Sequence, residues 1–337
     1  MRRRDFTGLA AAAAALALGA AAPAHAQGRE FTFHTIMVPE DPIAQGARLF
    51  AERLAELSGG QLTMTVYDSG QLFPQGASGD ALARGQIQLA DTGMSSFSEQ
   101  VPYSGMFISA YIFESVEHAE RFWASDVARR IFDEIAEKAN VRILNGSIYY
   151  GTRQLSLTDN VEGQVRTPED LEGVKLRMAN YPAWVALGEA LGADPTPVAF
   201  NETYLAMQTG MVDGQDNGLT TSKAMGFIEQ TAQLVLTDHL VWNLHYAINE
   251  QVWQSLTDEE RGWVQAAADE AHRHASDLIK EGEDTLLAEF EAMGVEIVEP
   301  DKEAFIEHAR RYYEENPEIT AQWDMEIYEA IQAMADE

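Results

Sequence analysis

Strand-like and helix-like patterns alternate in the N-terminal part of this chain. Residues 31–35 and 62–66 alternate apolar and polar side chains, as half-buried strands do. Residues 42–57, which lie between them, carry apolar side chains at helical spacing. A short helix over 81–85 and a strand over 87–92 continue the order. The alternation predicts an α/β fold with helices on both sides of a sheet.

A long helical pattern lies nearer the C-terminus. Residues 257–260 form a capping box, and apolar side chains then recur at helical spacing as far as Met293. One helix over this segment would be about 54 Å long, since an α-helix rises roughly 1.5 Å per residue, and it could lie across two domains. The alternative is a pair of helices broken at Gly282, because a glycine inside a helix costs about 1 kcal/mol.

Length and charge limit the classes of protein and partner. With 337 residues, the chain is long enough for two domains. Its formal net charge is −31, so its surface repels nucleic acids and anionic membranes, and neither is expected as a partner. The chain has no cysteine, so its stability must come from the core and not from disulfides.

The N-terminal segment, residues 1–26, has the pattern of a signal peptide. Arginines at 2–4 precede a run rich in Ala, Leu and Gly, and Ala24-His-Ala26 matches a cleavage site. A membrane anchor is the alternative, but the run is short and weakly apolar. We therefore expect cleavage near Ala26 and a periplasmic protein. Residues 3–6 also resemble a twin-arginine signal, which leaves the choice between Sec and twin-arginine export open.

Two arginines and an amide in the middle of the chain are the candidates for a ligand site. Arg177 lies on a predicted strand whose period of two turns it away from the apolar face, and Asn217 lies in a predicted loop after a short helix. Guanidinium groups such as those of Arg153 and Arg177 pair with both oxygens of a carboxylate and stay charged when partly buried. Either arginine alone could also be an ion-pairing surface residue, and Asn217 could belong to a turn.

The sequence carries no recognisable catalytic motif. It has no cysteine nucleophile, no Gly-x-Ser-x-Gly and no His-Glu-x-x-His. The eight histidines are scattered, and His272 and His274 would not share one face of a helix as metal ligands do. We therefore expect a binding protein and not an enzyme, with no catalytic residues, no metal and no cofactor.

The central motifs resemble those of a transport family. Gly151-Thr-Arg-Gln, the segment 168–177 and the segment 204–217 closely resemble the DctP-type solute receptors of tripartite ATP-independent periplasmic (TRAP) transporters. The resemblance covers essentially the whole mature chain. It implies a two-lobed α/β clamshell of the periplasmic-binding-protein type, in which hinge strands and a long helix span both lobes and the lobes close over an organic acid.

The same resemblance implies a division of the chain into lobes. After the signal peptide, lobe I would comprise 27–151 and 241–280. Lobe II would comprise 152–240 and 281–337.

The resemblance also implies roles for individual residues. Arg177 matches the arginine that binds the ligand carboxylate, and Arg153 matches a second arginine found in many members. Asn217 matches an asparagine that hydrogen-bonds the ligand, and Phe200 matches an aromatic residue that packs against it. Tyr150, Gly93, Trp242 and Thr35 are further candidates to line the cleft. A structural role is the favoured alternative for Tyr150, Trp242 and Thr35, and Phe200 could instead belong to the core.

Departures from the family pattern narrow the ligand. Gly93 or Met94 stands where the sialic-acid subgroup places a glutamate, which disfavours sialic acid. Lys175 stands where ectoine-binding members carry tryptophan, which argues against an aromatic cage for a zwitterion. Asn217 is followed by Gly218 in place of the usual proline, a change with little bearing on chemistry.

The expected ligand is a small organic anion. C4-dicarboxylates, hydroxy or keto acids, sugar acids and small sulfonates all fit two arginines and an amide. The resemblance implies delivery to a membrane permease driven by an ion gradient, and a monomer, since only a minority of the family dimerises through the C-terminal tail. The alternative is a ligand-sensing subunit that serves a receptor kinase.

Overall fold

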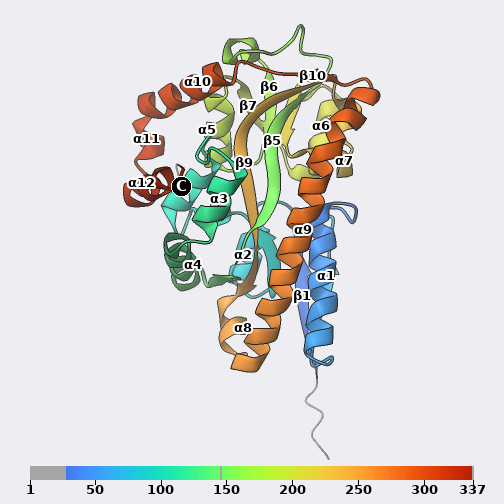
Figure 1. Ribbon diagram of the computed structural model, residues 1–337, viewed down its shortest axis with the longest axis vertical. Helices are drawn as coiled ribbons and strands as arrows, with labels where there is room; N and C mark the ends of the chain where they lie inside the picture. Colours follow the sequence, from blue (N-terminus) through green and yellow to red (C-terminus); the bar gives the residue numbers. More distant parts are fainter. Residues whose placement is uncertain (1–27, 145, 336–337) are drawn as a thin grey trace, which may run out of the picture.

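The expected α/β fold is confirmed in the structure, a computed structural model that describes residues 28–144 and 146–335. The predicted signal peptide lies outside the described residues. Eight strands follow one another in the order β2-β1-β3-β9-β5-β8-β6-β7, and two more, β4 and β10, also pair with β9 (Figure 1). The strands divide into two groups, here called the first and second sheets, that share β9.

The first sheet is built mainly from the N-terminal part of the chain. Strand β1 runs parallel to β2 and β3, whereas β3 and β4 are antiparallel to the C-terminal part of β9. The strands are β1 (Arg29–His34), β2 (Leu62–Tyr67), β3 (Leu89–Thr92), β4 (Val141–Ile143) and β9 (Gln233–Asn249). The helices beside them are α1 (Pro42–Leu57), α2 (Ser78–Ala83), α3 (Val116–Trp123) and α4 (Asp126–Ala139), with the 3-10 helices η1 (Met94–Phe97) and η2 (Pro102–Ile108).

The second sheet contains the central motifs. Strand β6 runs parallel to β7 and β8, and β5 is antiparallel to both β8 and β9. Its strands are β5 (Ile148–Leu157), β6 (Lys175–Met178), β7 (Asp194–Pro197), β8 (Gly214–Asn217), β10 (Glu296–Val298) and the N-terminal part of β9. Its helices are α5 (Pro182–Ala190), α6 (Thr203–Gln208) and α7 (Leu219–Ala224), with η3 (Pro168–Leu171), η4 (Phe200–Glu202) and η5 (Phe227–Gln230).

Two strands connect the sheets, as expected of hinge strands. The 17 residues of β9 pair with β10 at one end and with β3 and β4 at the other. Strand β5 follows β9 for most of its length, with irregularities of register between Tyr149 and Gly151 and between Arg153 and Leu155. The lobe boundaries given above remain a prediction.

Helix α9 (Asp258–Ala292) is a single helix of 35 residues, so the alternative break at Gly282 is wrong. Thr257 and Glu260 form the expected capping box at its start. A Cβ at Gly282 would lie 2.5 Å from Cγ2 of Thr220, so this glycine allows α9 to approach α7 closely. The helix contacts α1 beside the first sheet and α7 and β5 in the second, and Figure 1 shows it running along both.

The C-terminal segment returns to the first sheet. The imidazole of His118 in α3 lies 2.7 Å from the carbonyl oxygen of Ile331, and Arg121 donates to the carbonyl oxygen of Met334. The remaining helices are α8 (Glu250–Gln254), α10 (Lys302–Glu315), α11 (Pro317–Thr320) and α12 (Met325–Ala333). No helix in the described part of the chain is long and apolar enough to cross a membrane.

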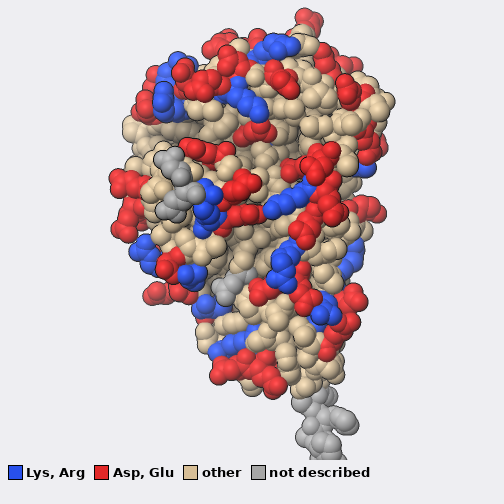
Figure 2. Space-filling view, in the orientation of Figure 1, with Lys and Arg blue, Asp and Glu red and all other residues tan. Residues whose placement is uncertain are grey.

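The charge of the chain is spread over its surface. Figure 2 shows acidic side chains across the visible face, with basic side chains interspersed among them. A ligand anion approaching this surface meets a repulsive field, so its capture requires a local positive site.

Candidate ligand-binding site

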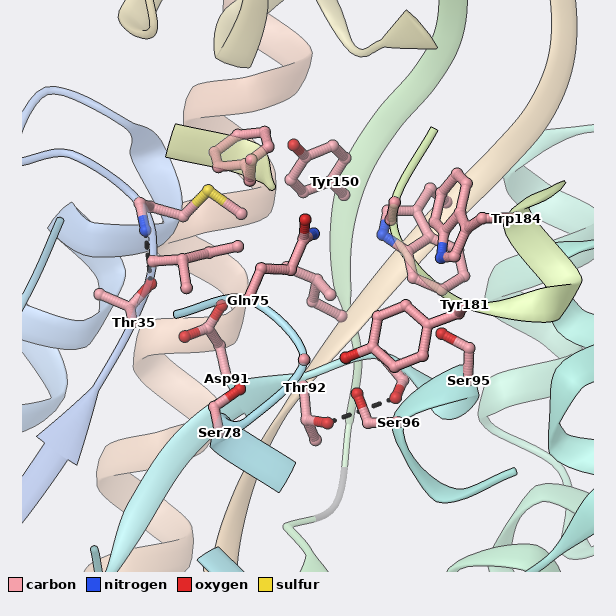
Figure 3. Close-up of a pocket in the computed structure, with 18 of the residues that line it drawn as sticks. Thr35, Gln75, Ser78, Asp91, Thr92, Ser95, Ser96, Tyr150, Tyr181 and Trp184 are labelled. Carbon is pink, nitrogen blue, oxygen red and sulfur yellow. Dashed lines mark hydrogen bonds between the residues drawn. The ribbon is translucent and has the colours of Figure 1, made fainter. Parts of the chain in front are cut away.

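A pocket lies between the two sheets, with side chains from both in its walls (Figure 3). The positions inside it that are open to the centre of a water molecule occupy about 90 Å³. One water needs roughly 10–15 Å³ on this measure, so the pocket has room for several waters or a small organic molecule. The pocket brings together all the positions expected along the cleft, namely Arg177, Arg153, Asn217, Phe200, Tyr150, Gly93, Trp242 and Thr35.

Arg177 reaches the pocket from β6. Its neighbours Leu176 and Met178 are fully buried in the core, so the alternation of the strand turns Arg177 to the opposite face, as expected. Its Nε donates to the carbonyl oxygen of Val198 at 2.9 Å, and its Nη2 donates to Oε1 of Gln75 at 2.8 Å. The second bond joins the two sides of the pocket, because Gln75 comes from the loop between β2 and α2.

The charge of Arg177 has no directly bonded counter-ion. The side chain is 2% exposed, and among the described residues it forms no ion pair and its Nη1 has no hydrogen-bond partner. Burial lowers the pKa of Arg177 to about 10, and the nearby charge of Arg153 acts in the same direction, against the attraction of Asp216. An anion in the pocket would therefore meet a positive charge that the protein itself does not neutralise.

Arg153, on β5, is held differently. Its Nε donates to Oδ2 of Asp216 at 2.6 Å, and its Nη2 donates to the carbonyl oxygen of the same residue. Nε2 of His239 lies 3.2 Å from the same carboxylate oxygen. Burial alone would raise the pKa of Asp216, but Arg153 and His239 hold it well below its usual range. The Arg153–Asp216 pair is thus a buried, internally neutralised unit.

Aromatic rings cover both guanidinium groups. The guanidinium of Arg153 lies 4.7 Å from the ring centroid of Trp184 and 5.6 Å from that of Tyr150. The guanidinium of Arg177 lies 5.7 Å from the ring centroid of Phe200. Such contacts between a cation and an aromatic face are favourable when the cation is desolvated. Phe200 therefore packs on the arginine as well as lining the pocket.

Asn217 is the last residue of β8, so the prediction that it lies in a loop is wrong. Its Oδ1 accepts a hydrogen bond from the Tyr150 hydroxyl at 2.9 Å, and its amide nitrogen donates to Gln215. Pairing of β5 with β8 places Asn217 opposite Gln154, which fixes the amide near Arg153.

Gly93 and Trp242 lie in direct contact. A Cβ at position 93 would lie 2.5 Å from Cζ2 of the Trp242 indole. The indole in turn packs edge-on against Trp184, with ring centroids 5.5 Å apart. A glutamate at position 93 would require this pair of rings to move, so the side-chain volume that a carboxylate would need is already filled.

Several pocket residues escaped the sequence analysis. Most come from the first sheet and its loops, and Figure 3 shows Asp91, Ser78 and Thr92 on one side of the pocket and Tyr150 and Trp184 on the other. Ligands of open α/β sheets bind beyond the carboxyl ends of strands, so the ends of the strands expected over 31–35 and 87–92 were the available signal. The residues missed include His34, Gln75, Ser78, Asp91, Thr92, Ser95, Ser96, Tyr181 and Trp184.

The chemistry of the pocket suits binding. Within residues 28–144 and 146–335, no group of three or more His, Asp or Glu side chains is placed to hold a metal ion. Two sheets joined by continuous strands, with a pocket of buried arginines between them, define a solute receptor of the periplasmic-binding-protein class.

Comparison with known proteins gives the family. Residues 33–318 match the profile described as "Bacterial extracellular solute-binding protein, family 7" (DctP), and the chain belongs to this family. It is 32% identical over 269 residues to the sialic acid-binding periplasmic protein SiaP of Vibrio cholerae. The aligned region covers 80% of this chain and 82% of that protein.

Solved structures agree with this assignment. A TRAP periplasmic solute-binding protein from Roseobacter denitrificans, with bound 3-deoxy-D-manno-oct-2-ulosonic acid, is 32% identical, with a TM-score of 0.86 over 91% of this chain and 99% of that one. Another from the same organism, with bound β-D-glucuronate, is 28% identical, with a TM-score of 0.81 over 90% of this chain and 99% of that one. The chain is thus a periplasmic solute receptor of the TRAP type and not an enzyme, as the sequence predicted.

Proposed function

We propose that this receptor binds a small organic carboxylate in the pocket between the sheets, with Arg177 as its principal partner. The observation that carries the proposal is the buried guanidinium of Arg177, which has no carboxylate bound to it among the described residues. A ligand carboxylate would supply the missing negative charge and accept hydrogen bonds from the free Nη1.

The other predicted residues take supporting roles in this proposal. Arg153 offers the ligand its Nη1, because Nε and Nη2 are bonded to Asp216. Asn217 reads a polar substituent, and Phe200 packs against the ligand as it packs against Arg177. Tyr150, Trp242 and Gly93 shape the wall.

Ligand binding would favour the closed arrangement. The pocket is lined from both sheets, so only a closed receptor lets one ligand touch both walls, and this difference in contacts is what shifts the equilibrium. The hydrogen bond from Oγ1 of Thr221 to Oδ2 of Asp41, at 2.9 Å, also joins α7 to the start of α1.

Relatives support an organic acid as the ligand. The solved relatives carry a bound octulosonic acid or glucuronate, and a curated relative is named for sialic acid. Sialic acid itself remains disfavoured in this proposal because Gly93 or Met94 stands where the sialic-acid subgroup places a glutamate, and a side chain added at position 93 would meet the Trp242 indole.

A thermal-shift panel of organic acids, followed by calorimetry, tests the proposal. Ligands that bind the native state raise the melting temperature by mass action. Arg177→Ala should weaken the binding of the best ligand by about 2–5 kcal/mol, since the truncation leaves the desolvated ligand carboxylate without its cation. Arg129→Ala, on the exposed side of α4, is the matched control and should bind as the wild type does. Unchanged affinity in Arg177→Ala would remove the basis of the proposal.

Delivery to a membrane permease, by a monomeric receptor, completes the proposed function. Uptake of the identified ligand into vesicles that contain the neighbouring permease should depend on this receptor. Binding to the sensor domain of a receptor kinase, with no receptor-dependent uptake, would instead support the sensing alternative.

A further inference from the structure

We infer that the pocket selects hydroxylated monocarboxylates over dicarboxylates, and that Asp91 and His34 make this selection. The inference rests on the proposed function, since it assumes that one carboxylate of the ligand is bound by Arg177. It goes further, because it assigns the opposite wall of the pocket to the rest of the ligand.

The distribution of charge around the pocket allows for one ligand carboxylate. Arg153 and Arg177 are the only lysine or arginine side chains in the described wall, and both belong to the second sheet. Asp216 neutralises Arg153 through a 2.6 Å ion pair. One positive charge, that of Arg177, is left for the ligand, so a second ligand carboxylate has no cation of its own.

His34 ends β1 and belongs to the opposite wall. It is 1% exposed, and neither ring nitrogen has a hydrogen-bond partner among the described residues. Burial lowers its pKa, which favours the neutral imidazole. A neutral imidazole offers one donor and one acceptor, and a hydroxyl group can pair with either. The unsatisfied ring is thus suited to a ligand hydroxyl.

Asp91 lies near the end of β3, in the same wall. Its Oδ1 is buried without a hydrogen-bond partner among the described residues, and none of the ion pairs there involves this carboxyl group. When ionised, it accepts hydrogen bonds from ligand hydroxyls but repels a ligand carboxylate, because like charges in a desolvated site disfavour each other.

Further hydroxyl groups line the same pocket. They can donate or accept, and they carry no charge, so they suit a ligand with several hydroxyl groups. Figure 3 shows Asp91 close to Thr35 and Ser78 in this wall. The hydroxyl residues that line the pocket on this side are Thr35, Ser78, Thr92, Ser95 and Ser96.

Matched pairs of acids that differ in one carboxylate test the inference. Galactonate against galactarate, gluconate against glucarate and threonate against tartrate keep the carbon chain and change only the terminal group. Each acid is titrated separately by calorimetry at pH 8, and succinate and hexanoate are included in the panel as acids without hydroxyl groups. The acid that binds most tightly should be a hydroxylated monocarboxylate. Its diacid partner should bind at least about tenfold more weakly.

Two variants test whether Asp91 and His34 select the ligand or only stabilise the fold. Asp91→Asn keeps the shape of the side chain and removes its charge. The diacid should therefore bind more tightly to this variant, whereas the monocarboxylate should not. The ratio of monocarboxylate affinity to diacid affinity should fall at least about threefold. His34→Gln should weaken hydroxylated acids and leave hexanoate unchanged. Asp126→Asn, on the exposed surface of α4, is the matched control and should keep the wild-type ratio.

Each result bears on one of the two claims. A dicarboxylate or an acid without hydroxyl groups as the tightest ligand would overturn the selection and leave the proposed function intact. Equal losses for both members of a pair in Asp91→Asn would show a merely structural role. Binding of no carboxylate at all would refute the proposed function itself. If Asp91→Asn does not fold, the ratio of monocarboxylate to diacid affinity in the wild-type protein still tests the selection.

Discussion

The two arginines of the pocket differ in how the protein treats their charge. Arg153 and Arg177 are 4% and 2% exposed, so burial does not distinguish them. Arg153 is bonded to a buried carboxylate, whereas Arg177, within residues 28–144 and 146–335, donates only to the neutral oxygen atoms of Val198 and Gln75. The comparison shows that the charge of Arg153 is neutralised within the fold, whereas that of Arg177 is bonded to no carboxylate among the described residues.

The largest expected effect is on stability at Arg153. Arg153→Ala should lower the free energy of unfolding by about 3–5 kcal/mol, because it leaves the Asp216 carboxylate buried without its cation. Denaturant unfolding of the ligand-free protein measures the loss. A change below about 1 kcal/mol would mean that the ion pair does not stabilise the fold, and the comparison would fail.

A substitution at Gly93 should act on the Arg153 side of the pocket. In Gly93→Ala the added methyl group would lie 2.5 Å from the Trp242 indole, which packs against Trp184 over Arg153. Overpacking of this kind costs about 1–3 kcal/mol. Gly262→Ala in α9 is the control, since its Cβ meets no atom within 4 Å and should stabilise the helix. Thermal unfolding of both variants distinguishes them, and equal stabilities would contradict the tight contact.

The carboxyl groups of Asp91, in the pocket wall, and of Asp41, at the N-terminal cap of α1, should make stability depend on pH. Burial raises the pKa of Asp91 to about 7 and that of Asp41 to about 6, from an unfolded value of 3.8. The native state therefore holds protons that the unfolded state has released between about pH 4 and pH 7. Unfolding of the ligand-free protein should need more free energy as the pH falls from 8 to 5, by up to about 1.4 kcal/mol per pH unit for each group.

Asp91→Asn should flatten this pH dependence, and Asp126→Asn should not. Urea unfolding at each pH gives the slope. A slope of the opposite sign would show that the carboxyl groups are stabilised in their ionised form, which would contradict the raised pKa values of Asp91 and Asp41.

The smallest expected effect is on the stability of the ligand-free protein when Arg177 is replaced. Arg177→Met keeps most of the side-chain volume and removes a charge that is bonded to no acidic side chain in the described part of the chain. The free energy of unfolding without ligand should change by less than about 1 kcal/mol or should rise, because burying an unpaired charge is unfavourable. The same variant should lose ligand binding. Destabilisation as large as that of Arg153→Ala would erase the difference between the two arginines.

The sequence predicted the α/β fold, the continuous long helix and most of the pocket residues that come from the second sheet, together with Gly93 and Thr35 from the other side. Strand alternation is a local pattern and turned Arg177 away from the core. The roles expected of Arg153 and Asn217 came instead from the resemblance of their motifs to the family. The sequence could not assign different partners to the two arginines, since Asp216 reaches Arg153 only through the pairing of β5 with β8. His34 and Asp91 escaped because their meeting depends on two parallel strands that are far apart in sequence.

The shared strand β9 has a consequence for the synthesis of this protein. It pairs with β3, β4, β5 and β10, and it ends at Asn249. A nascent or truncated chain that stops before it can assemble the β2-β1-β3 ladder, but it leaves the β3 edge open to strands of other chains. Strands β1 to β4 of the first sheet are separated from β9 by β5 to β8, so a continuous N-terminal fragment that carries only β1 to β4 would lack the strand that covers the β3 edge and would be prone to aggregate.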